Sequence, residues 1–167
     1  MGRPAEEDDM SYDVSTTTET GRHLAVKRFD ARPEVDDMGQ KSSAAFGGVA
    51  GYLARIGVPV AGPAISVYEM EGDLFHVAAG FVVEAPFEPG EGVEPLQLPA
   101  CEVATTVHIG AYERLGEAYE ALQKGVVAQG RQVEESGVMW EEYWSGPEAP
   151  PEETRTVVFW PLRPLQG

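Results

Sequence analysis

An internal repeat constrains the fold of this chain more than any other feature. The pattern strand, helix, strand, strand occurs twice, over residues of about 11–84 and again over about 100–162. The helices are indicated by apolar residues at helical spacing, and the strands by runs rich in β-branched and aromatic residues. Two β-α-β-β units of this size predict a duplicated α+β domain with antiparallel sheets, helices on one face and a ligand cleft between the repeats.

The letters of the two repeats also match at one place. The segments GPAISVY and GVMWEEY each enter a strand after a helix and run from a Gly to a Tyr six residues later. On this alignment Tyr68 corresponds to Tyr143, and Ser66 corresponds to Glu141. Since residues two apart on a strand point to the same side, Glu141 and Tyr143 are expected to share a face.

Segments of different composition flank and join the repeats. Residues 1–10 are acidic and lack aromatic residues, which predicts a disordered tail. Residues 85–99 contain six Pro and Gly residues and are expected to form a connector, because such residues do not suit the interior of a strand or helix. Residues 11–167 are therefore expected to form one domain.

Each predicted helix has an apolar face and a glycine at its end. The first helix is expected to start at Pro33 and to end at Gly57. Its buried face should hold Phe46, Val49, Leu53 and Ile56. The second helix is expected to end near Gly130. Its buried face should hold Tyr112, Leu115, Tyr119, Leu122 and Val126.

The strand predicted over residues 74–84 is apolar on both sides. Phe75 and Val77 fall on one side, and Ala78 and Val82 on the other. If helices cover only one side, the other is a second apolar surface. This pattern predicts a ligand pocket on the side opposite the helices.

The charge balance limits the kinds of partner. The chain contains 28 Asp and Glu residues and 12 Lys and Arg residues, which gives a formal net charge of −16. Because this charge repels phosphate backbones, no direct nucleic-acid binding is expected. No apolar run reaches the ~20 residues that span a bilayer, and the N-terminus lacks a signal-peptide pattern, so no membrane contact is expected. A single cysteine, Cys101, indicates a reducing compartment, and a cytoplasmic monomer or homodimer is expected.

No metal or cofactor site is predicted. The three histidines fall on different strands without Asp or Glu at a ligand spacing. The glycine-rich stretch at 47–51 lacks the Lys-Ser or Lys-Thr of a phosphate-binding loop, and no Gly-x-Ser-x-Gly nucleophile motif occurs.

Three segments resemble one known family. HIGAYERLGEAYEALQKGV (108–126) resembles the H-x-G-x-Y-x-x-L-x-x-A-Y-x-x-L segment of GyrI-like small-molecule-binding domains, also called AraC-type effector-binding domains. WEEYWSGPEAPPEETRTVVFWPL (140–162) resembles their closing hairpin, and YLARIGVPVAGPAISVYE (52–69) resembles their first helix and following strand. The resemblance implies a duplicated fold whose central cleft binds amphipathic, often cationic aromatic compounds. With only an acidic segment of about ten residues in front of the domain, a stand-alone form is expected.

The resemblance also implies a site. The key glutamate of the family stands in an E-x-Y position that falls on Glu141, beside Tyr143. Internal symmetry adds Tyr68, and Tyr112 and Trp160 are further candidates for ligand contact. A carboxylate among aromatic rings suits a lipophilic cation, since each ring contributes cation–π attraction of roughly 0.5–2 kcal/mol.

One residue departs from the family pattern. Glu142, between Glu141 and Tyr143, is usually apolar in the family, and it is expected to be the exposed member of the pair. The opposite register, in which Trp140, Glu142 and Trp144 face the ligand, stays open.

These residues leave the role of the ligand open. The leading interpretation is sensing, sequestration or detoxification by binding. A first alternative, also implied by the resemblance, is hydrolysis of cyclopropane-bearing genotoxins, in which Glu141 positions or deprotonates a water molecule and Tyr143 is a second catalytic candidate beside it. A second alternative is a protein-interaction module that acts on DNA gyrase.

Overall fold

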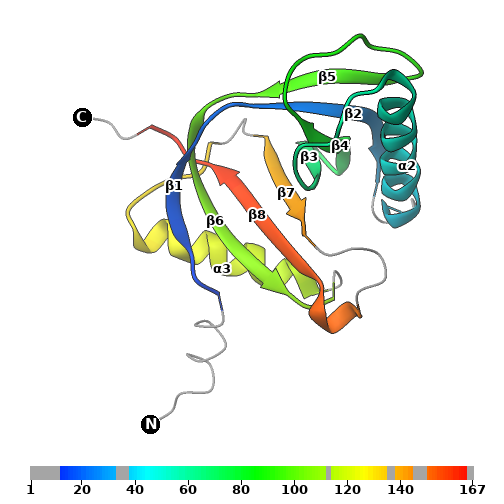
Figure 1. Ribbon diagram of the computed structural model, residues 1–167. Coiled ribbons are helices and arrows are strands. Elements are labelled where there is room, and N and C mark those ends of the chain that lie inside the picture. The colour runs from blue at the N-terminus through cyan, green and yellow to red at the C-terminus, as the bar shows by residue number, and fades with distance from the viewer. Residues whose placement is uncertain (1–11, 33–37, 112–113, 135–137, 145–149, 165–167) are drawn as a thin grey trace. The chain divides into compact units, whose positions relative to one another are not determined.

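The computed structural model describes residues 12–32, 38–111, 114–134, 138–144 and 150–164 (Figure 1). Its elements in chain order are β1 (Ser15–Glu19), β2 (Arg22–Ala31), α2 (Met38–Ile56), β3 (Ala64–Glu71), β4 (Leu74–Val83), β5 (Val93–Leu98), β6 (Cys101–Ile109), α3 (Leu115–Ala128), β7 (Met139–Tyr143), the short 3-10 helix η2 (Pro151–Glu153) and β8 (Arg155–Pro161). The α+β class and the duplicated order of elements are confirmed. The predicted tail lies outside the described residues, and the single domain predicted for 11–167 stays a prediction.

The chain forms two compact units. Unit 1 contains β1, β6, α3 and β8, and unit 2 contains β2, α2, β3, β4, β5 and residues Val138–Glu142, which include all of β7 except Tyr143. In the described parts of both units, neither helix is long and apolar enough to cross a membrane.

Unit 2 is built on antiparallel strands in the order β7-β3-β4-β2-β5. Glu71 pairs with Leu74, so Gly72 and Asp73 form a tight turn between β3 and β4. Gly72 has a φ of 62°, which favours glycine because a side chain would be strained there. This is the hairpin that the Glu-Gly-Asp sequence predicts.

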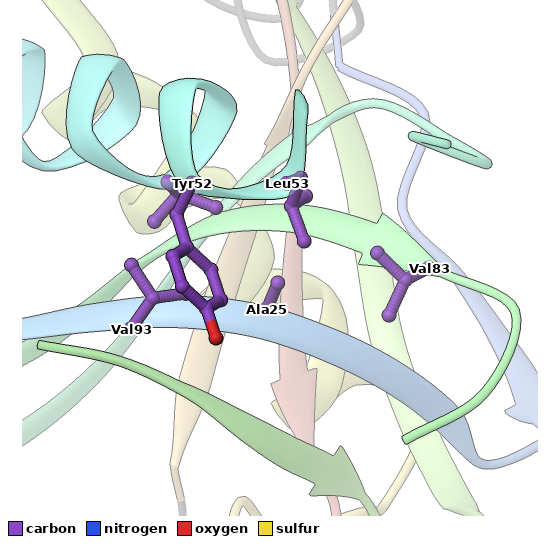
Figure 2. Packing of buried hydrophobic residues seen from close by; sticks show 6 residues of the cluster. Ala25, Tyr52, Leu53, Val83 and Val93 are labelled. Atoms are coloured by element: carbon purple, nitrogen blue, oxygen red, sulfur yellow. The ribbon is translucent and has the colours of Figure 1, made fainter. Parts of the chain in front are cut away.

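Helix α2 packs its apolar face on this sheet. Figure 2 shows Tyr52 and Leu53 directed from the helix toward Ala25 and Val93 of the strands. The predicted face is correct for Val49 and Leu53, which are buried, but Ile56 at the helix end is 40 % exposed. Gly57 follows with a φ of 77° and ends the helix as predicted, whereas the predicted start at Pro33 lies outside the described residues.

The segment predicted as a connector contains a strand. Of residues 85–99, β5 occupies Val93–Leu98 and pairs with β2. The prediction is wrong here because β5 stands last in the strand order and has no neighbouring strand on its outer side. Such an edge strand tolerates a residue that lacks a backbone N–H, in this case Pro95. The preceding loop is held by the Tyr52 hydroxyl, which donates to the Glu88 carbonyl oxygen at 2.5 Å.

Unit 1 repeats this plan with the strand order β1-β6-β8 and helix α3. Leu122 and Val126 of α3 pack on Ala104 and Val158 of the strands. Strand β1 precedes β2 in the chain but pairs with β6, and β5 precedes β6 but pairs with β2. The outer strand of unit 1, β1, therefore comes from the segment just before β2 in the chain, and the outer strand of unit 2, β5, comes from the segment just before β6.

A histidine on unit 2 joins three strands at the turn end of the sheet. His76 of β4 forms hydrogen bonds through Nδ1 to Asp30 of β2 at 2.7 Å and through Nε2 to Glu71 of β3 at 2.9 Å. The bonds to Glu71 and then to Asp30 raise the pKa of His76 above its ordinary value of 6.5.

This contact predicts a pH-dependent contribution to stability. Because the folded pKa is raised, the contribution is fully present below the ordinary pKa and is lost as pH rises through the folded one. Wild type should exceed His76→Gln in melting temperature at about pH 5.5, and the gap should close by about pH 8.5. Thermal unfolding of both proteins at the two pH values measures this, and an equal gap at both would contradict it.

Candidate functional site

Strand β7 places two neighbouring carboxylates inside the protein. Glu141 and Glu142 are 6 % and 4 % exposed. Because successive side chains on a strand alternate, the two carboxylates point to opposite faces. A buried carboxylate is costly unless it is hydrogen-bonded or paired with an opposite charge, so each face has to supply its own partner.

Tyr68 supplies a partner for Glu141. It belongs to β3, which lies beside β7 in the sheet. The Tyr68 hydroxyl donates a hydrogen bond of 3.3 Å to Oε1 of Glu141. The Tyr68 ring meets Phe75 edge to face, with 6.1 Å between the ring centroids. The Glu141 carboxylate is therefore bound by the hydroxyl of Tyr68, and the ring of Tyr68 is fixed by its contact with Phe75.

This pair lies on the side of the sheet that α2 covers. Tyr68 is the register partner of Val77, and it packs against the cluster formed by Val77, Ala79 and Ala45 of α2. The other side chains that border this cluster are Phe29, Met38, Phe46 and Phe75. The prediction of a pocket opposite the helices is wrong for Tyr68 and Glu141. Both sides of the strands are apolar, so the sequence pattern did not distinguish the helix side.

Arg22 supplies the partner for Glu142. Its guanidinium forms an ion pair with Oε2 of Glu142, and 23 % of the Arg22 side chain is exposed. On β2, Arg22 alternates with Leu24 and Val26, so it lies on the side opposite Ala25 and α2. The prediction that Glu142 is exposed is wrong, because Arg22 compensates the buried charge.

The remaining predicted residues are placed differently. Tyr143 ends β7, is half-buried and belongs to unit 1. Trp160 packs in the core of unit 1, edge to face with Tyr119 of α3 at 6.1 Å. Tyr112 lies outside the described residues. For these three aromatic residues, ligand contact stays a prediction.

The two tryptophans of the alternative register differ in burial. Trp140 is 2 % exposed and shares the Glu142 side of β7, whereas Trp144 is 56 % exposed. Sequence reasoning missed Arg22 as the partner of Glu142. The charged residue in the E-x-Y segment was the only signal that a compensating cation had to exist.

Ser66 is a second residue that was not singled out as part of the site. It is fully buried on β3, two residues before Tyr68, and therefore on the same side as Tyr68. Its correspondence with Glu141 in the internal alignment was a signal that could have found it. Within the described ranges, no three His, Cys, Asp or Glu side chains gather in a group that could hold a metal ion.

Solved structures with the same fold cover nearly the whole chain. The C-terminal domain of EcmrR is 18 % identical, with a TM-score of 0.70 over 92 % of this chain and 99 % of that one. A hydrolase from Listeria innocua is 12 % identical, with a TM-score of 0.64 over 95 % and 98 %. SAV2435, solved bound to tetraphenylphosphonium, is 10 % identical, with a TM-score of 0.59 over 90 % and 94 %. At these identities the likeness establishes the fold alone.

Sequence comparison identifies the family. No curated protein sequence matches the chain. The model of the GyrI-like small molecule binding domain matches residues 43–163, which include most of α2, the E-x-Y segment and the closing hairpin. The chain therefore belongs to the family of GyrI-like small-molecule-binding domains.

Proposed function

We propose that this protein binds amphipathic, aromatic or cationic small molecules through Glu141, and thereby senses, sequesters or detoxifies them. The observation that carries the proposal is the buried Glu141 carboxylate, hydrogen-bonded by Tyr68 among apolar and aromatic side chains. Such a carboxylate has lost most of its hydration, so a cation that reaches it meets little competition from water.

The surroundings favour a lipophilic cation over a small inorganic one. Phe29, Phe46 and Phe75 offer apolar area and ring faces to an organic ligand. The net charge of −16 raises the local concentration of cations around the protein. The same negative charge repels phosphate groups, so this protein is not expected to bind nucleic acid directly.

One structural neighbour supports this class of ligand. SAV2435, which shares the fold, was solved with tetraphenylphosphonium, a cation with four aromatic rings. Tetraphenylphosphonium is therefore the probe of choice for this protein. Neutral triphenylphosphine oxide, which has three rings and a polar P=O group, is an aromatic comparison compound without the charge.

The role of Glu141 is tested by Glu141→Gln, which keeps the shape of the side chain and removes its charge. Affinity for tetraphenylphosphonium should fall at least about tenfold, since a desolvated charge contact is typically worth ~2–5 kcal/mol. Affinity for triphenylphosphine oxide should stay the same or rise. Isothermal titration calorimetry measures both. Equal losses for the two compounds would contradict a charge-selective site.

Glu142→Gln is the matched control, because it removes a neighbouring buried carboxylate that points to the other face. It breaks the ion pair with Arg22 and should lower the free energy of unfolding by about 1–3 kcal/mol. Affinity for tetraphenylphosphonium should change less than about threefold. Chemical denaturation and calorimetry separate the two effects. A loss of binding in Glu142→Gln but not in Glu141→Gln would assign the site to the face of Trp140 and Glu142.

Hydrolysis of a strained electrophile is a second candidate function. The observation that favours it is the Tyr68 hydroxyl on Glu141, which holds the carboxylate in one orientation, as a general base requires. Mass spectrometry after incubation with cyclopropane-bearing alkylators distinguishes the two functions. Recovery of unchanged compound supports binding alone. Product that forms with wild type and not with Glu141→Gln would assign a hydrolase.

A further inference from the structure

Ser66 lies in the same row of side chains as the proposed ligand carboxylate. It stands two residues before Tyr68 on β3 and points to the same side of the sheet. Across the sheet, Ser66 pairs with Ala79 and Tyr68 pairs with Val77. Both alanine and valine side chains lack hydrogen-bonding groups, so β4 offers the serine no side-chain partner.

Within the part of the chain that the structure describes, the Ser66 hydroxyl is buried without a hydrogen bond. The residue has an exposed fraction of 0 %, and Oγ has no partner among the residues that the structure describes. Nearly all buried polar groups in folded proteins are hydrogen-bonded, because a buried unsatisfied hydroxyl costs free energy. An alanine at this position would avoid that cost, so the hydroxyl has no evident role in the unliganded fold.

The internal repeat relates the Ser66 hydroxyl to the proposed ligand carboxylate. Ser66 is the residue of the first repeat that corresponds to Glu141 of the second. Glu141 accepts a hydrogen bond from Tyr68, the neighbour of Ser66 on the same side of β3. The equivalent positions of the two repeats therefore carry a carboxylate and a neutral hydroxyl, two groups that recognise different parts of a molecule.

We propose that Ser66 is a specificity-determining residue of the Glu141 site, and that its hydroxyl forms a hydrogen bond with a polar group of the ligand. The preferred ligands are then amphipathic organic cations that also carry a hydroxyl or a similar hydrogen-bonding group, rather than purely apolar cations. This inference rests on the proposed function, since it requires a ligand at Glu141.

Two matched cations test the inference. Tetraphenylphosphonium has no hydrogen-bonding group, and (para-hydroxyphenyl)triphenylphosphonium differs from it by one hydroxyl. Wild type should bind the hydroxylated cation about three- to tenfold more tightly, the range expected for one hydrogen bond. Ser66→Ala should lose this preference and bind the two cations with about equal affinity. Isothermal titration calorimetry provides the four dissociation constants.

Three controls accompany the titrations. Ser43→Ala removes an exposed hydroxyl of α2 and should keep the wild-type preference. Ser66→Ala should melt at the wild-type temperature or higher, because it removes an unsatisfied buried group. Ser66→Cys, which has a weaker donor of similar size, should lose most of the preference and replaces Ser66→Ala if that variant does not fold.

The outcomes separate the two proposals. If tetraphenylphosphonium binds wild type and the hydroxylated cation shows no advantage, or keeps its advantage in Ser66→Ala, the inference about Ser66 is overturned and the proposed function stands. If neither cation binds wild type, both are overturned. A preference that is present in wild type and Ser43→Ala and absent in Ser66→Ala supports the inference.

Discussion

The burial of two adjacent carboxylates in β7 is the constraint on which the candidate site depends. Neighbouring side chains on a strand face opposite sides, so Glu141 and Glu142 cannot share a partner. The ion pair with Arg22 compensates Glu142 on one side, and the Tyr68 hydroxyl binds Glu141 on the other. Because each carboxylate has its own partner on its own side of the sheet, the register of β7 is strongly specified. A shift of the strand by one residue would exchange the two carboxylates and separate each from its partner.

The outer strand of each unit, β1 or β5, pairs with a strand that is distant in the sequence. Strand β1 completes the strands of the second repeat, and β5 completes those of the first. The segment just before β2 therefore contributes backbone hydrogen bonds to β6, and the segment just before β6 contributes them to β2. This arrangement explains why a stretch with six Pro and Gly residues still contains an ordered strand: β5 needs partners on one side only.

The sequence predicted most elements correctly because their signals are local. The turn at Gly72 and the helix end at Gly57 both follow from residues close in the chain. The placement of β5 was missed because its pairing with β2 is a contact between distant segments, which no local composition encodes. The pocket side was missed for a related reason: with apolar residues on both sides of the strands, alternation identifies two faces but not the one that receives a helix.

By itself, the sequence determined the α+β class, the duplication, the family and the position of the E-x-Y glutamate, since these depend on the order and spacing of residues along one chain. Tertiary structure decided which side of the sheet Glu141 faces and that Glu142 is buried against Arg22. It also decided that the Ser66 hydroxyl lies buried beside Tyr68 with no hydrogen-bond partner among the described residues. The physical reason is that burial and charge compensation depend on residues brought together from separate strands, such as Arg22 and Glu142, whose contact is set by strand pairing and not by sequence distance.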